Sequence, residues 1–599
     1  MQQPPSEQAT RFPHAGRTNP ALPGASLPTT PVDVPVAQRQ RWPQLPAGKR
    51  ASTLRRIFFQ LMLLGLLLGL CFVLLYPLFG EALPGSFVAQ ALPRAFPWVT
   101  QFFWMRQLPQ LVGVLAHVSW LDLRAASPVA EANLALLVLG VAGLLLWLAA
   151  HAGQRATRDH LQKGSMRALL ALVWVFALGF GLLFVLLPGS LSQQALLSGL
   201  SGRLILVYHA NPYLVSAGML ARDPLYRALA PDSFVAPLAG PLWLDLSVLP
   251  AWAAQDNPLM VVLAFRVAGL VLHLINALLI WAILARLKPE LRLTGTIFYA
   301  WNPALLLLGV SEASMDLTAI FFLLFGAFLL QRRSLLLGWA CFVLAALINP
   351  LCLLLLPLFL RVLLKEVGPG KHGERVLWGL LCVVLFALLV VLAYAPYWSG
   401  LGFIGIEQRL QAVFWEGGAQ SSLLAALSKL PFAGWPPAAW LLTPHHWLLL
   451  PALIIGGLLL LGMWITDNLE LALLFSSWIF LALFLFLPVN TPWLILLPLV
   501  LALASSSRRT GLLAHLLAVG ALVAYCLAYW PGHWDGQALA TIGLAALIWG
   551  WTLFFLSTWQ MTHQEEEEPQ GRRRLSLSRP SWPPRPTAWP SSRPGWRRP

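Results

Sequence analysis

Two acidic residues near the middle of the chain are the first candidates for chemistry. Glu312 and Asp316 follow the apolar run 293–310 and are four residues apart, so on a helix they would share one face. An acid at membrane depth costs roughly 2.5–3.5 kcal/mol on insertion scales, so it usually has a functional or paired role. Repulsion between the two carboxylates would favour one of them as a proton acceptor. The alternative is that both lie in water at a helix end.

A polar segment between two long apolar runs holds candidate binding residues. It contains Arg203, Tyr208, Asn211 and Tyr213 within the stretch GRLILVYHANPY. Guanidinium, amide and phenol groups are suited to phosphate and sugar hydroxyl groups. The alternative is an ordinary interfacial loop in which the aromatic residues act as anchors.

Three polar residues lie inside apolar runs. Arg266 is about eight residues into the run 259–285, so we expect a partner or a polar cavity for it. Asn302 and Asn349 each precede a proline, and their simplest role is to satisfy backbone groups that the proline leaves free. Arg266 and Asn302 are also candidate substrate-binding residues.

The composition defines the elements that must position these side chains. The chain has 599 residues, 58% of them hydrophobic and 11% charged, with a formal net charge of +16. About 25% charged residues is usual in soluble domains. The composition therefore excludes a soluble enzyme, a disordered chain and a nucleic-acid-binding protein, and indicates a polytopic membrane protein.

Apolar runs predict an all-α fold with about 12 to 14 transmembrane helices. Fourteen runs are candidates, and they fall near 57–79, 131–151, 168–188, 259–285, 293–310, 316–331, 334–348, 351–364, 376–396, 447–466, 471–488, 490–506, 511–530 and 537–558. Prolines break two pairs, 334–348 with 351–364 and 471–488 with 490–506. These pairs are either short spans or re-entrant segments.

Loop charge predicts the orientation. Clusters of Lys and Arg fall in alternate connections, on the same side as the N-terminus. The positive-inside rule makes that side the cytoplasm, so we expect a multi-pass cell-membrane protein with both termini cytoplasmic. Three long connections, 80–130, 189–258 and 397–446, then lie on the outer face between the spans.

The two ends of the chain differ from the apolar body. Residues 1–53 and 561–599 are rich in Pro, Ser and Arg, and we expect disordered cytoplasmic tails. The five cysteines lie singly inside apolar runs, which is typical of small buried hydrophobic residues rather than metal ligands.

The order of several short motifs resembles a known family. After GRLILVYHANPY come GPLW, QDNPLMVVLAFRVAGLVLHLINA, YAWNPALLLLGVSEASMDL and, later, AYAPYWSGL. This order resembles the polytopic C-type glycosyltransferases of bacteria, which are mannosyltransferase-like proteins that use polyprenol-phosphate sugars. The resemblance covers residues 168–430. It implies a membrane core over that range, preceded by two spans within 54–167 and followed by C-terminal helices within 431–560.

The resemblance also implies site residues. Asp316 remains from an acidic pattern of the family, and with Glu312 it is the candidate catalytic acid–base group. Gln194 stands where the family carries an aspartate, and Asn349 stands where it often has a lysine. Gln194 cannot accept a proton, so either Glu312 or Asp316 has that role or the chain binds lipid-linked sugar without transferring it. Asp223, Asp232 and Asp245 are other acids that could substitute.

The sequence thus favours a membrane hexosyltransferase, with a catalytically inactive relative and a transporter or flippase as alternatives. A hexose such as mannose would pass from a polyprenyl-phosphate donor to an envelope glycan or lipid on the outer face. The expected partners are this lipid-linked donor, the acceptor and membrane lipids, and not nucleic acid. No metal or other cofactor is expected, because no outer loop contains a DxD-type carboxylate pair.

Overall fold

Every secondary-structure element described in the computed structural model is a helix. The described residues are 47–82, 87–98, 128–158, 163–189, 193–214, 220–229, 239–367, 372–398, 449–486 and 492–505, with isolated positions such as His515. The expected tails, most of the first and third long connections, and the last two apolar runs lie outside these residues. Residues 1–46 form a unit separate from the body that starts at Ala47.

Five helices are long and apolar enough to cross a membrane. They are α1 (Ala47–Ala82), α5 (Pro128–Arg158), α6 (Lys163–Val185), α10 (Pro258–Leu287) and α15 (His372–Tyr394). Each covers a predicted apolar run and extends it by several polar residues. In α1 the helix begins at Ala47, so residues 47–53, which the sequence assigned to a disordered tail, continue the first span. Several such helices indicate a membrane protein.

Prolines break the later helices into shorter pieces. α11 (Arg292–Ala300) and the π-helix η3 (Leu305–Ser311) meet at Asn302-Pro303 with a 56° bend. The other short elements are η2 (Pro289–Leu291), α12 (Met315–Gln331), α13 (Leu335–Ile348), η4 (Pro350–Leu355), α14 (Leu356–Glu366), η5 (Ala395–Tyr397), α19 (Leu449–Ile465), α20 (Leu469–Phe486), η8 (Pro492–Ile495) and α21 (Leu496–Ala504). Proline removes a backbone donor and stops a helix, which explains these boundaries.

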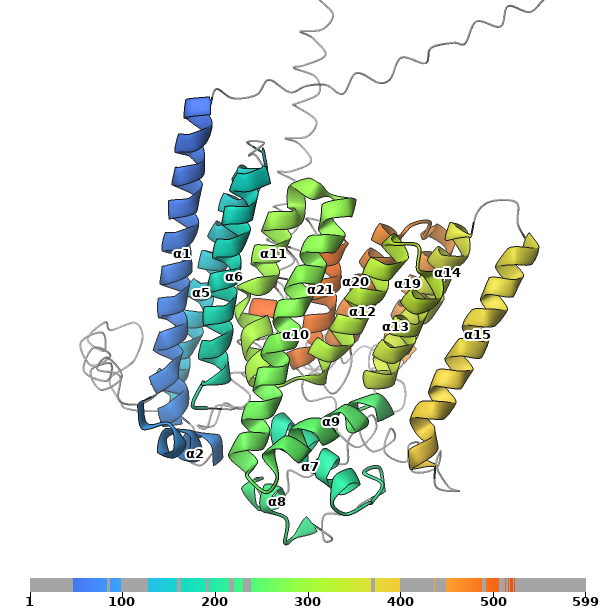
Figure 1. Cartoon of the computed structure of the whole chain (residues 1–599), viewed down its shortest axis with the longest axis horizontal. Coiled ribbons are helices and arrows are strands. Elements are labelled where there is room, and N and C mark those ends of the chain that lie inside the picture. The colour runs from blue at the N-terminus through green and yellow to red at the C-terminus, as the bar shows by residue number, and fades with distance from the viewer. Residues whose placement is uncertain are drawn as a thin grey trace, which may run out of the picture. The chain divides into compact units, whose positions relative to one another are not determined.

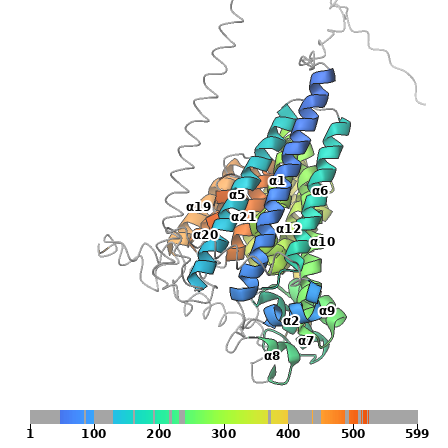
Figure 2. The ribbon, with the colours of Figure 1, turned by 90° about the vertical axis from the view of Figure 1, so that its left-hand side faces the viewer.

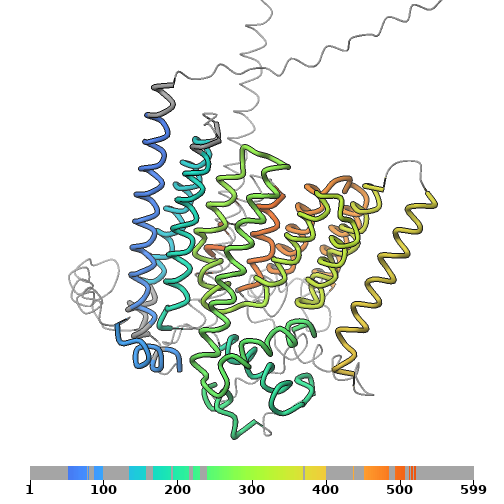
Figure 3. Tube along the Cα trace, viewed as in Figure 1, coloured from blue at the N-terminus to red at the C-terminus, as the bar shows by residue number. Residues whose placement is uncertain are grey.

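Three helices of the polar segment gather at one end of the helical body. These are α7 (Gln194–Leu206), α8 (Pro224–Ala228) and α9 (Pro241–Ala254), beside the first turns of α10 (Figures 1 and 2). The short α2 (Phe87–Ala95) lies at the same end. We call this the α7–α9 end. The long helices run from it towards the other end, as the Cα trace shows (Figure 3).

The core is apolar throughout, while α15 exposes apolar side chains on most of its surface. Buried leucines and aromatic residues join α1, α5, α6, α10, α11, α12, α13 and α21 into one cluster. By contrast Val376, Val384 and Val391 of α15 are each more than 60% exposed in the described structure. Apolar surface of this kind suits hydrocarbon better than water.

Candidate functional site

Arg203 is held by two carboxylates at the α7–α9 end. Its Nε donates to Asp223 Oδ2 at 2.9 Å, and its Nη1 donates to Asp256 Oδ1 at 2.7 Å and to the Gln255 carbonyl at 2.9 Å. The Tyr208 hydroxyl donates to the same Asp223 oxygen at 3.0 Å. Arg203 and Asp223 are both buried, so this ion pair joins α7 to the starts of α8 and α10.

The charges of this cluster fix its protonation states. Burial alone would lower the pKa of the Arg203 guanidinium, but the hydrogen bonds and charges of Asp223 and Asp256 outweigh that effect and raise it. Partial burial, followed by the contact with Asp223, raises the pKa of the Tyr208 phenol. Arg203 therefore stays charged, Tyr208 stays a donor, and Arg203 serves to hold the loop.

Two of the resembling motifs meet in a second cluster at this end. Asn211 Nδ2 donates to the Tyr397 carbonyl at 2.8 Å, and the rings of Tyr213 and Tyr397 pack edge to face. The Tyr213 hydroxyl donates to the Ala239 carbonyl at 2.8 Å, and that of Tyr397 donates to the exposed carboxylate of Asp245. The sequence predicted no contact between these motifs, which are nearly 190 residues apart.

Arg266 is fully buried and binds backbone carbonyls. Its Nη atoms donate to the carbonyls of Val185, Leu187 and Gly189 at 2.7–3.2 Å, and Nε donates to the Ser311 carbonyl at 2.8 Å. These carbonyls end α6 and η3, where helix dipoles favour a positive charge. The partner expected for Arg266 is therefore the end of two helices.

One local motif explains most of the Asx-Pro sites. In each, the side-chain oxygen accepts a hydrogen bond of 2.8–3.0 Å from the backbone N–H two residues on, directly after the proline. The residues are Asn211, Asp223, Asn257, Asn302 and Asn349. This is a common way to start a turn or helix. The capping role expected for Asn302 and Asn349 is confirmed, and the Nδ2 group distinguishes them.

Glu312 and Asp316 do not share one helical face, and that expectation was wrong. Glu312 ends the π-helix η3, whereas Asp316 lies in the first turn of α12. Between them Ala313 has a positive φ of 54°, and Ser314 caps α12 by accepting from the Asp316 N–H. A cap and a left-handed residue reverse the chain, so i to i+4 spacing no longer applies. Both acids are 1% exposed.

Asp316 is bound by neutral donors. Asn349 Nδ2 donates to its Oδ1 at 2.7 Å, and Ser314 Oγ donates to its Oδ2 at 3.1 Å. Among the described residues, no Arg, Lys or His lies within ion-pair distance of this carboxylate. A carboxylate offers about four lone-pair directions, so two donors leave it able to accept another proton or hydroxyl.

Helix α9 docks beside this carboxylate. The Gly240 N–H donates to the Ile348 carbonyl at 2.8 Å, one residue before Asn349. A side chain at Gly240 would place its Cβ 2.0 Å from the Leu347 carbonyl oxygen, so only glycine permits this approach. In the same GPLW motif the Trp243 indole donates to Ser198 Oγ at 3.3 Å. The motif thus links the α7–α9 end to Asn349 and, through it, to Asp316.

No protein-family model, curated protein or solved structure matches this chain. Within the described ranges, no three His, Cys, Asp or Glu side chains group as metal ligands. Gln194, at the start of α7, has its Oε1 buried with no hydrogen-bond partner in the described part of the chain. Asp232 lies outside the described residues.

The candidate residues therefore fall into separate places. Arg203 and Tyr208 share one cluster, Asn211 and Tyr213 a second, and Asp316 lies with Asn349 in a third. Arg266 caps helices. Ser314 and Gly240 were missed as site residues; the Ser-x-Asp spacing before an apolar run signals the cap, whereas no signal in the sequence reveals the Gly240 approach.

Proposed function

We propose that the chain is a membrane glycosyltransferase that transfers a hexose from a polyprenyl-phosphate sugar to an envelope glycan or lipid. The order of motifs over residues 168–430 supports this proposal. So does the convergence of those motifs, since HANPY, GPLW, EASMD, INP and AYAPYW are joined by hydrogen bonds around the α7–α9 end.

The observation that carries the proposal is the environment of Asp316. A general base must be able to gain a proton, and a carboxylate held by a guanidinium gives up much of that ability. Asp316 has only amide and hydroxyl donors, in contrast to Asp223. In the proposed step the carboxylate takes the proton of the acceptor hydroxyl as its oxygen bonds to the sugar C1. The bond from C1 to the phosphate oxygen breaks, and polyprenyl phosphate leaves.

The buried position of Asp316 requires an opening for the acceptor. In the proposal this occurs where Gly240 contacts Ile348, because separation of α9 from the end of α13 uncovers the segment next to Asn349. The exposed residues Tyr208 and Asp245, on the same side, are then available to acceptor hydroxyl groups.

The proposal includes an orientation with the α7–α9 end outside the cell and both termini in the cytoplasm. Basic residues support it, since Arg286, Arg332 and Arg333 are exposed at turns of α10, α12 and α13 remote from α9. In a variant without native cysteines, an impermeant thiol reagent should label cysteines placed near 215 and 430 in intact cells. Labelling near 160 or 575 would reverse the orientation.

The direct test is sugar transfer from radiolabelled polyprenyl-phosphate hexose in membranes that contain the protein. Transfer that depends on the protein supports the proposal. Donor binding without transfer would favour the inactive relative, and Gln194→Asp then tests whether a lost base accounts for it, because activity should appear. Movement of the intact donor across the bilayer without transfer would favour a flippase.

A further inference from the structure

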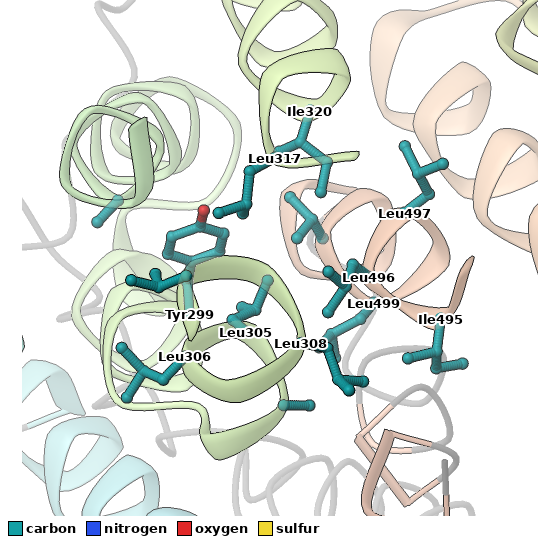
Figure 4. Packing of buried hydrophobic residues seen from close by; sticks show 14 of the residues in the cluster. Tyr299, Leu305, Leu306, Leu308, Leu317, Ile320, Ile495, Leu496, Leu497 and Leu499 are labelled. Atoms are coloured by element: carbon teal, nitrogen blue, oxygen red, sulfur yellow. The ribbon is translucent and has the colours of Figure 1, made fainter. Parts of the chain in front are cut away.

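Three fully buried polar side chains lie together at the junction of α10, α11 and α12. His273 and Asn276 are three residues apart on α10, so they lie on the same side of that helix, and Tyr299 lies near the end of α11. The rings of His273 and Tyr299 stack with centroids 4.9 Å apart and an angle of 20° between planes. The Tyr299 hydroxyl lies close to Asn276 and points towards Leu317 (Figure 4).

Each of these side chains satisfies one polar atom with the backbone or leaves one unsatisfied. His273 Nε2 donates to the Ala300 carbonyl at 3.1 Å, and Asn276 Nδ2 donates to the Leu317 carbonyl at 3.1 Å. Three atoms remain buried with no hydrogen-bond partner among the described residues, namely His273 Nδ1, Asn276 Oδ1 and the Tyr299 hydroxyl. Leaving such atoms unpaired costs about 1–3 kcal/mol each, so three in one place call for a ligand.

The chemistry of the three atoms selects that ligand. When Nε2 carries the hydrogen that it donates, Nδ1 of a neutral imidazole is an acceptor. Asn276 Oδ1 is a second acceptor, and the Tyr299 O–H is a donor. Two acceptors and one donor match the two hydrogens and a lone pair of one water molecule, and buried waters typically make about three hydrogen bonds.

We propose that His273, Asn276 and Tyr299 bind one internal water molecule in the middle of the helical body. The water donates to His273 Nδ1 and Asn276 Oδ1 and accepts from the Tyr299 hydroxyl. It therefore joins α10 to α11, while Asn276 Nδ2 joins α10 to the first turn of α12. This site is independent of the proposed transferase activity, since none of its residues contacts Asp316 directly in the described structure.

A pair of tyrosines provides a matched test. The Tyr76 hydroxyl donates to the Leu183 carbonyl, so Tyr76→Phe removes a satisfied hydrogen bond and should lower the thermal midpoint in detergent. If Tyr299 binds water, Tyr299→Phe should lower the midpoint by a similar amount. If its hydroxyl is unpartnered, removal of that group should leave the midpoint unchanged or raise it, and that result would overturn the proposal.

A second measurement identifies the occupant. With histidine labelled with ¹⁵N, the Nδ1 resonance of His273, assigned by its loss in His273→Phe, reports whether the atom accepts a hydrogen bond. It should show an accepted bond in the wild type and move towards the non-bonded value in Tyr299→Phe and Asn276→Leu. An unbonded Nδ1 in the wild type, or a resonance that shifts with sodium concentration and so indicates a cation, would each contradict a water site.

Discussion

Two buried carboxylates at neighbouring corners of the molecule have opposite surroundings. Asp223 and Asp316 are each 1% exposed, and each lies in the first turn or cap of a short helix. Asp223 accepts from a guanidinium, a phenol and a backbone N–H, and its charge is matched by that of Arg203. Asp316 accepts from an amide and a hydroxyl, with no ion pair.

The difference separates a structural acid from a reactive one. A buried carboxylate paired with arginine is held in its charged form and fixes the geometry around it. A buried carboxylate with neutral donors alone has a smaller difference in free energy between its charged and protonated forms, which is what proton transfer requires. Backbone strain occurs at both corners, at Gln255 and at Ala313, and so does not distinguish them.

The largest expected effect is on activity at the Asp316 corner. Asp316→Asn keeps the size of the side chain and can still bond to Ser314, but it removes the base. Transfer should fall roughly 10²–10⁴-fold, which is typical of a lost general base, while donor binding and the thermal midpoint change little. The measurement is radiolabelled sugar transfer alongside donor binding.

Two further variants sharpen this result. Glu312→Gln should reduce transfer less than Asp316→Asn, since Glu312 lies at the end of η3 rather than in the α12 cap. Full activity in the double variant would refute the assignment. Asp245, whose exposed carboxylate accepts from Tyr397, would then be the next candidate.

The second expected effect is on stability at the Asp223 corner. Asp223→Asn leaves a buried guanidinium with one exposed partner, and loss of a buried ion-pair member costs about 3–5 kcal/mol. The matched control is Asp256→Asn, which removes a carboxylate 79% exposed from the same guanidinium and should cost at most about 1 kcal/mol. Thermal unfolding in detergent compares them, and equal losses would show that burial does not govern this pair.

Some of this contrast could be predicted from the sequence, and some could not. The apolar runs predicted the helices from α1 to α21, and the Asx-Pro pairs predicted helix starts, because both depend on local residue types. The sequence paired Glu312 with Asp316 because a uniform helical period was assumed across EASMD, where a cap and a left-handed residue intervene. It treated Arg203 as a substrate ligand because its partners, Asp223 and Asp256, are 20 and 53 residues away.

The third effect compares two asparagines with the same cap. Asn302→Leu and Asn349→Leu each remove a cap worth about 1 kcal/mol. Asn302 Nδ2 has no partner in the described structure, whereas Asn349 Nδ2 donates to Asp316. Asn349→Leu should therefore cost about 1–3 kcal/mol more, since hydrogen bonds to charged groups are stronger, and should also slow transfer. Similar midpoints and transfer rates in the two variants would show that the amide does not support Asp316.

The smallest expected effect is the loss of both tails. Residues 1–45 and 570–599 lack apolar periodicity and cannot bury enough surface to offset the entropy of ordering. Their removal leaves α1 and both acidic corners intact in composition, so the midpoint should stay within about 0.5 kcal/mol of wild type, as for surface changes. The effects of Asp223→Asn and Asp316→Asn should also be the same in the shortened chain as in the full one, because distant sites contribute additively. A shortened chain in which either effect shrinks would place a tail in contact with that corner, and the contrast between the two carboxylates would then depend on more than their immediate donors.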